Sequence, residues 1–173
     1  MNTVAVNLTS SNEGLRLFVY DDATGNKIEK QTIIKGNATI GWGICIQYPN
    51  GLDDDEADFL FLYRMYKIEN ELSHAVSNWS QLSPVRQAVL SDMAYNMGIA
   101  GLLSTECVRG VEQENFIQAA ASIAHLKAFA ENTSRYVKNG AILASDVYDT
   151  ATGTLKNIPS ISQEIKDFVS GVA

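Results

Sequence analysis

Two acidic residues and one hydroxyl residue near the N-terminus have the types and spacing for acid–base chemistry. Glu13 comes directly before a run that alternates like a β-strand, Asp22 stands at the far end of that run, and Thr39 enters from a following hairpin pattern. Hydrolysis of a glycosidic bond needs a protonated acid for the leaving oxygen and a carboxylate that orients water or stabilises an oxocarbenium-like transition state. Spacing alone is a weak signal, because acidic residues at strand ends are ordinarily solvated or cap the backbone.

Three separated motifs, in the right order, resemble the phage-type (T-even phage lysozyme-like) lysozymes and endolysins of glycoside hydrolase family 24. In residues 12–22 (NEGLRLFVYDD), an acid followed by Gly-Leu-Arg-Leu leads through a strand to an aspartate. Residues 39–43 hold the Thr-Ile-Gly-x-Gly element of that family. Residues 82–90 and 93–98 are similar to its buried central helix and the cleft-side end of that helix. The resemblance covers residues 12–148, and three ordered motifs make it specific.

The resemblance implies an α+β, lysozyme-like fold with a small N-terminal antiparallel β-lobe, a larger all-helical C-terminal lobe and an active-site cleft between them. It implies a muramidase that hydrolyses the β-1,4 bond between N-acetylmuramic acid and N-acetylglucosamine in bacterial peptidoglycan, with inversion. Glu13 would be the general acid, its proton held by an apolar pocket, while Asp22 in a polar turn stays ionised and positions water together with Thr39. The implied substrate-binding residues are Asn96, Ser104, Thr105 and Arg135.

The sequence departs from the family pattern in the N-terminal third. Ile44 stands where the family often has histidine, so a structural ion pair should be missing. Residues 23–35 form an insertion, because the interval from the second carboxylate to the Thr-Ile-Gly-x-Gly element is longer than in the T-even phage enzyme. The insertion either supplies positive charge toward an anionic glycan or is a solvated surface loop. Its lysines are Lys27, Lys30 and Lys35.

A C-terminal stretch, residues 149–173, extends past the resemblance. Ser160 with Gln163 predicts the start of a last helix. We expect this extra helix to pack back on the domain through its apolar side chains rather than to bind a partner. Those side chains are Ile161, Ile165, Phe168 and Val169.

The remaining elements follow from periodicity and capping residues. Alternation predicts a strand over residues 15–20, followed by a turn over 21–26. A second hairpin is predicted from residues 32–34 and 38–46, joined by a turn at 35–37. Helices are predicted to begin at Asp53 with Glu56, to run from Ser83-Pro84 to Gly98, and to follow at 116–130 and 133–144. The first of them should face a core with Phe61, Met65, Ile68, Leu72, Val76 and Trp79.

Length and composition favour one globular domain over residues 1–173, with a β-lobe at about 13–50 and a helical lobe over 51–173. The net charge of −7 argues against nucleic acid, which needs clustered lysine and arginine. With two histidines and two distant cysteines, Cys45 and Cys107, we expect free thiols, no metal site and no cofactor. We expect a monomer without membrane insertion or signal peptide, made in the host cytoplasm and reaching the wall after membrane permeabilisation.

Competing interpretations remain open at this point. A lytic transglycosylase would use one acid and yield an anhydro end, whereas Asp22 and Thr39 together favour the addition of water. A catalytically weak or inactive glycan-binding or virion structural module would keep the fold without turnover, since fold does not fix function. A bacteriocin catalytic domain is a further alternative, for which we find no receptor-binding region. Trp42 and Trp79 either stack on sugar or belong to a core, and His74 and His125 have no acid or serine constellation around them.

Overall fold

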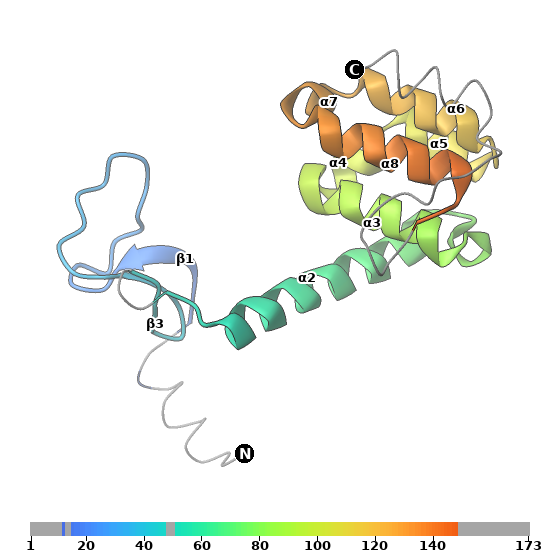
Figure 1. Ribbon diagram of the computed structural model, residues 1–173. Coiled ribbons are helices and arrows are strands. Elements are labelled where there is room, and N and C mark those ends of the chain that lie inside the picture. Colours follow the sequence, from blue (N-terminus) through green and yellow to red (C-terminus); the bar gives the residue numbers. More distant parts are fainter. Residues whose placement is uncertain (1–11, 13–14, 48–50, 149–173) are drawn as a thin grey trace. The chain divides into compact units, whose positions relative to one another are not determined.

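The computed structural model of the protein describes residues 12, 15–47 and 51–148. The chain divides into two compact units, with the boundary between Leu60 and Phe61. The strands lie in the first unit, and the second is built from helices (Figure 1). A small antiparallel sheet followed by a helical remainder confirms the α+β, lysozyme-like fold class.

A three-stranded antiparallel sheet in the order β1-β2-β3 forms the centre of the first unit. Tyr20 pairs with Thr39 across β1 and β2, and the register shifts between Arg16 and Tyr20. The predicted turn over 21–26 is present, closed by a hydrogen bond from the N–H of Asp21 to the carbonyl of Asn26 (2.9 Å). The strands are β1 (Arg16–Asp21), β2 (Ala38–Gly41) and β3 (Ile44–Cys45).

The predicted hairpin between residues 32–34 and 38–46 is wrong. Residues 32–34 are not in a strand, because two backbone N–H groups within 35–37 donate to the carboxylate of Asp21 instead of closing a hairpin turn. The tight hairpin joins β2 to β3, where Gly41 and Gly43 adopt φ of 68° and 76°. Glycine reaches this left-handed region without steric cost, which fixes the turn there.

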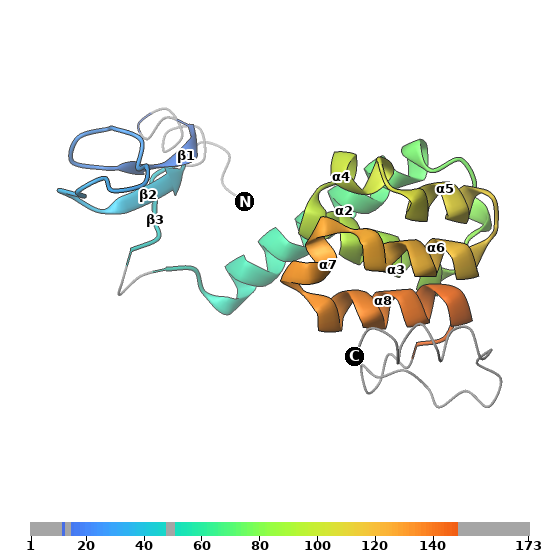
Figure 2. The same ribbon diagram turned by 90° about the horizontal axis from the view of Figure 1, so that it is seen from above.

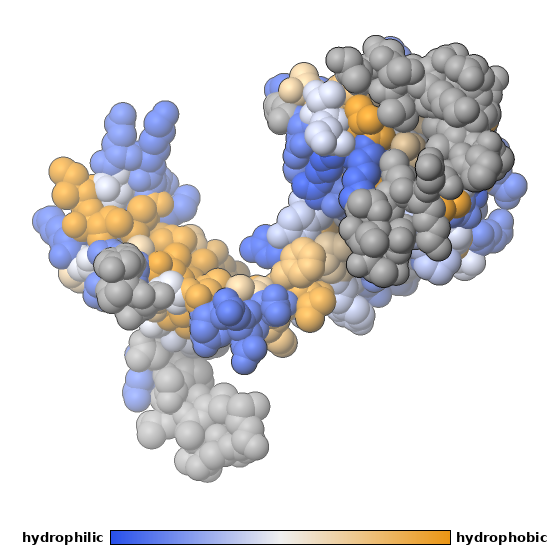
Figure 3. All heavy atoms as spheres, in the orientation of Figure 1, coloured by the Kyte–Doolittle hydropathy of each residue, from blue (hydrophilic) through white to orange (hydrophobic). Residues whose placement is uncertain are grey.

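The strand predicted from alternation is confirmed, but neither of its faces is buried along its whole length. Leu17 is 83% exposed, and Phe18, on the opposite face, is 40% exposed. Burial is concentrated at the end of β1, where Tyr20 and Asp21 lie. Apolar side chains are therefore visible on the surface of this unit (Figure 3). Ile33, in the same unit, is 85% exposed.

The long helix α2 (Asp54–Ala75) begins with the predicted capping box. The N–H of Glu56 donates to Oδ1 of Asp53 (2.8 Å), and the N–H of Asp53 donates to Oε2 of Glu56 (3.1 Å). Each side chain thus satisfies a backbone donor that the helix itself cannot. The predicted apolar stripe holds only in the C-terminal half, where Leu72 is buried, while Phe61 is 47% exposed.

Short helices build the rest of the second unit. The predicted helix over 116–130 is broken into α6, a 3-10 turn and α7, whereas the one over 133–144 is continuous as α8. Helices α5, α6 and α8 lie side by side (Figures 1 and 2). The elements are η1 (Trp79–Gln81), α3 (Pro84–Met97), α4 (Ile99–Leu103), α5 (Glu106–Glu112), α6 (Phe116–Ser122), η2 (Ile123–His125), α7 (Lys127–Glu131) and α8 (Thr133–Ser145).

One apolar core holds the helices of the second unit together. Its fully buried members include Leu90 and Met93 from α3, and Tyr136 and Leu143 from α8. Helices α5 and α6 meet at Gly110, where a Cβ would lie 3.0 Å from the Cα of Ala119. Any larger residue at this position would push the two helices apart.

Helix α3 begins and ends where its sequence predicts. Ser83 caps it by accepting a hydrogen bond from the N–H of Arg86 (3.2 Å), and Pro84 occupies the first turn. Gly98, with φ of 82°, ends the helix. The C-terminal helix predicted from Ser160 lies outside the described residues.

Neither Cys45 nor Cys107 forms a disulfide, as predicted. Cys107 is fully buried in α5, and this burial raises the pKa of its thiol to about 12. Across the residues that the structure describes, no helix has both the length and the apolar character needed to span a bilayer.

Candidate active site

The polar end of the β-sheet is organised around Asp22, which directly follows β1. Its Oδ1 accepts the backbone N–H of Asn37 (2.6 Å), and its Oδ2 accepts the side-chain amide of the same residue (2.9 Å). The N–H of Asp22 in turn donates to the carbonyl of Asn37 (3.0 Å). Both side chains are exposed, so the carboxylate is held in one orientation while it still faces solvent.

Thr39 is joined to Asp22 through the same residue. Its hydroxyl donates to the carbonyl oxygen of Asn37 (3.2 Å), and the side chain is buried in β2. Antiparallel pairing of Tyr20 with Thr39 brings the end of β1 beside the start of β2. Two of the predicted catalytic residues are therefore connected by Asn37, a residue that the sequence marked only as part of a turn.

Asp21, the neighbour of Asp22, anchors the loop from inside. Its buried carboxylate accepts backbone N–H groups from Ala23 (3.1 Å), Lys35 (2.8 Å) and Gly36 (2.9 Å). These hydrogen bonds, with that from Lys35 the largest influence, lower the pKa of Asp21 below its ordinary value. A charged acceptor thus ties the two ends of the 23–35 insertion together.

Hydrogen bonds also keep Asp22 ionised. The side-chain amide of Asn37, followed by its backbone N–H, lowers the pKa of the Asp22 carboxyl below its ordinary value. The negative charge of Asp21 opposes this effect but does not reverse it. At neutral pH, Asp22 is therefore a carboxylate, in agreement with the expectation from its polar turn.

Gly36 occupies a position that no other residue fits without displacement. A Cβ built there would lie 2.0 Å from Oδ1 of Asp22 and 2.7 Å from the Cβ of Ala23. Contacts this short are far inside van der Waals distance, so the absence of a side chain allows the loop to approach Asp22.

The insertion itself runs beside β1 in its first half. Lys27 forms an isolated bridge with Tyr20, and the N–H of Ile28 donates to the carbonyl of Val19 (2.9 Å). The ammonium of Lys27 pairs with Glu29 at 3.2 Å on the surface. Lys30 and Lys35 are exposed.

Glu13, the predicted general acid, lies outside the described residues. Ile44, at the position where the family often has histidine, is an exposed member of β3 and pairs with Ile40. Trp42 is 46% exposed in the β2–β3 turn, whereas Trp79 packs against the helical core.

The second unit holds the predicted substrate-binding residues in three places. Asn96, exposed near the end of α3, accepts a hydrogen bond at Oδ1 from the hydroxyl of buried Tyr136 (2.6 Å). Ser104 and Thr105 line one cavity of about 470 Å³ between α4 and α6. Thr105 also caps α5, accepting the N–H of Val108 (3.3 Å), so its hydroxyl has a structural task.

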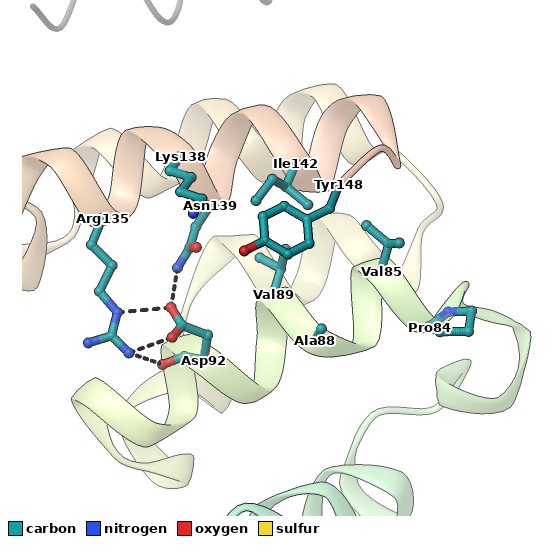
Figure 4. Close-up of a pocket in the computed structure, with 10 residues that line it drawn as sticks. All are labelled: Pro84, Val85, Ala88, Val89, Asp92, Arg135, Lys138, Asn139, Ile142 and Tyr148. Carbon is teal, nitrogen blue, oxygen red and sulfur yellow. Dashed lines mark hydrogen bonds and ion pairs between the residues drawn. The ribbon is translucent and has the colours of Figure 1, made fainter. Parts of the chain in front are cut away.

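Arg135 stands apart from these residues, on α8. Its Nε donates to Oδ2 of Asp92 (2.9 Å), its Nη2 lies 2.5 Å from Oδ1, and Asn139 donates to the same carboxylate (2.8 Å), as Figure 4 shows. Burial raises the pKa of Asp92, but the hydrogen bonds and the charge of Arg135 bring it below its ordinary value. Asp92 raises the pKa of Arg135 in turn. The pair joins α3 to α8, and no local sequence signal indicated it.

Comparison with known proteins adds an independent observation. The model of the Phage lysozyme family matches residues 10–142, which is more than three quarters of the chain. The matched range includes every residue predicted for catalysis or substrate binding and excludes the C-terminal stretch. None of the curated proteins matches the chain.

Proposed function

Since the chain belongs to the phage lysozyme family, whose members hydrolyse bacterial peptidoglycan, we propose that it is an endolysin with muramidase activity. The bond cleaved is the β-1,4 linkage between N-acetylmuramic acid and N-acetylglucosamine, with inversion at the anomeric carbon. Residues 1–173 act as one lysozyme-like domain, and the protein works as a monomer. It reaches the wall from the host cytoplasm after the membrane has been permeabilised.

The arrangement of Asp22, Asn37 and Thr39 is the observation that carries this proposal. A hydrolase needs a carboxylate that is ionised, fixed and open to solvent, and Asp22 has a lowered pKa, two hydrogen bonds from Asn37 and an exposed side chain. A buried hydroxyl connected to the same residue stands beside it in β2. These features suit the positioning of one water molecule.

Each group has a defined task in the proposed reaction. Glu13 donates its proton to the glycosidic oxygen as the bond to the anomeric carbon breaks. Asp22 accepts a proton from the water that adds to that carbon from the opposite face, and Thr39 orients this water. The products are a free hydroxyl on the departing sugar and a new reducing end, and proton return from Asp22 to Glu13 through solvent completes the cycle.

Binding of the glycan is assigned to the second unit. We assign Ser104 and the exposed Asn96 to hydrogen bonds with sugar hydroxyl and acetamido groups. Thr105 lines the same cavity as Ser104, whereas Asn96 does not line it. Arg135 adds a positive charge on α8, although two of its nitrogens already bind Asp92. Its contribution to glycan binding is therefore the weakest of the set.

Digestion of purified Gram-negative peptidoglycan, followed by mass spectrometry of the released muropeptides, tests the function. Wild type should release fragments with reducing ends, and Glu13→Gln should release none. Glu29→Gln is the matched control, because Glu29 is an exposed residue of the same unit whose carboxylate pairs with Lys27 on the surface. Anhydro ends would identify a transglycosylase, and absence of products from wild type would favour a binding or structural module.

A further inference from the structure

A groove between α3 and α8 shares only Arg135 with the residues proposed above for catalysis and glycan binding. It encloses about 400 Å³, and its floor and walls are largely apolar (Figure 4). Ala88 is exposed on its α3 side, and Ile142 lines it from α8. Apolar surface left open on this scale generally marks a place where another group binds.

The two helices that border the groove are joined by interactions at both of its ends. At one end Arg135 on α8 binds the carboxylate of Asp92 on α3. At the other end Arg86 on α3 donates to the carbonyl of Leu143 (3.0 Å) and pairs with Asp146 at 3.5 Å. Because α3 and α8 are connected twice, their spacing along the groove is fixed.

We propose that the chain's own C-terminal segment, residues 149–173, fills this groove. The last described residue, Tyr148, lines the groove itself, with its ring 5.0 Å from the Nζ of Lys138, so the segment starts at the groove's edge. A tethered segment has an effective concentration on the order of millimolar. It therefore occupies the site ahead of a free ligand of equal intrinsic affinity.

The sequence of the segment has the pattern that such a groove accepts. Its apolar residues recur at intervals of four, three and one, which places them on one face of a helix. A helix that lays an apolar face into an apolar groove is a common mode of peptide recognition. These residues are Ile161, Ile165, Phe168 and Val169.

The charges and dimensions of the groove also match those of the C-terminal segment. The described residues that line the groove include two cations, Arg135 and Lys138, and one acid, Asp92, while residues 160–169 carry two acids and one lysine. Residues 161–169 would span about 12 Å as a helix, close to the run of about 10 Å along α8 from Arg135 to Ile142. Residues 149–160 extend at most about 40 Å, which is ample for the chain to turn back.

Hydrogen exchange of the full-length protein tests the placement directly. Ala88→Arg puts a long charged side chain on the groove floor at an exposed helical position, where arginine is a good helix former. We expect amide exchange in residues 160–170 to accelerate at least tenfold in this variant. Ala121→Arg is the matched control, because Ala121 is an exposed alanine of α6 that does not line the groove, and exchange should stay as in wild type.

A double-mutant cycle distinguishes docking in the groove from a merely destabilising substitution. Ala88→Arg, and separately Ile165→Ala with Phe168→Ala, should each lower the melting temperature by about 5 °C, and their combination should lower it no further. Additive losses, or unchanged exchange in Ala88→Arg, would overturn the proposal. Protection of residues 160–170 that depends on protein concentration would also overturn it, because the segment would then occupy a second copy of the chain.

Discussion

Asp22 and Asp92 are both fixed carboxylates, but the molecule fixes them by opposite means. Among the residues that the structure describes, Asp22 is held by neutral donors, the backbone and side-chain N–H groups of Asn37, and its side chain is exposed. Asp92 is held by the guanidinium of Arg135, which neutralises its charge. A carboxylate that must act on water keeps its charge uncompensated, whereas one that joins two helices can be neutralised.

The two units also differ in the interactions that order them. The loop around Asp22 is ordered by hydrogen bonds, three of them to the buried carboxylate of Asp21. The helices around Asp92 are ordered by an apolar core, with the ion pair added at its edge. Substitutions near Asp22 should therefore change activity more than stability, and substitutions near Asp92 should do the reverse.

Removing the charge of Asp22 should produce the largest effect. Asp22→Asn keeps an oxygen that can accept the backbone N–H of Asn37, so the fold should persist, but an amide cannot accept a proton from water. We expect kcat to fall at least about 100-fold, the range typical for loss of a general base. Steady-state hydrolysis of peptidoglycan, with Glu29→Gln as control, measures it, and a loss below tenfold would contradict the role assigned to Asp22.

Displacing the Asp22 carboxylate without changing its chemistry should lower kcat somewhat less than Asp22→Asn does. Gly36→Ala puts a methyl group 2.0 Å from the present position of Oδ1, so Asp22 must shift. A displacement near 1 Å lowers turnover by up to about 100-fold. We expect kcat to fall by roughly tenfold or more, with some loss of melting temperature because the methyl group also meets Ala23. Ile33→Ala, an exposed change in the same insertion, should leave both as they are. A large drop in stability with full kcat would reverse our distinction between the two regions.

Removing one neutral donor should shift the pH profile. Asn37→Ala keeps the backbone N–H but loses the side-chain hydrogen bond that most strongly lowers the pKa of Asp22. That pKa must then rise, so the acid limb of the kcat/KM profile should move to higher pH, with a loss at neutral pH of only a few-fold. Asn26→Ala, in the neighbouring turn, should leave the limb in place. A limb that moves to lower pH in Asn37→Ala would show that another group titrates there.

Local signals in the sequence predicted the parts of the fold that local chemistry determines. The capping box of Asp53 with Glu56, and the start of α3 at Ser83 and Pro84, involve residues three positions apart or fewer, and both are present. The strand ending in Asp21 was predicted for the same reason. The hairpin predicted between residues 32–34 and 38–46 was wrong, because the backbone N–H groups of residues 35 and 36 donate to Asp21 instead of closing a turn. The observed partner of β1, the strand β2, lies within the predicted run 38–46.

The candidate site was predicted in its residue types but not in its connections. Family motifs pointed to Asp22 and Thr39, yet the link through Asn37 joins positions fifteen residues apart across an insertion. The pair of Asp92 with Arg135 spans 43 residues, and neither residue belongs to a spacing pattern that indicates a contact. Such pairs depend on how elements pack, which periodicity does not encode.

Breaking the Asp92–Arg135 pair should have the smallest effect of the series, and this effect should be on stability. Asp92→Asn loses a partly buried, doubly hydrogen-bonded ion pair, for which we expect a loss of about 1–2 kcal/mol, a few degrees in melting temperature. Glu106→Gln breaks the exposed pair with Arg109 and should change stability by less than about 0.5 kcal/mol. Because the pKa of Asp92 is lowered in the folded protein, its contribution is present at pH 7 and is lost as the pH falls from about 4 through that lowered pKa. Urea denaturation of both variants at pH 7 and pH 3 measures this. Equal losses of stability in the two variants at pH 7 would mean that Asp92 contributes no more to stability than a surface acid does.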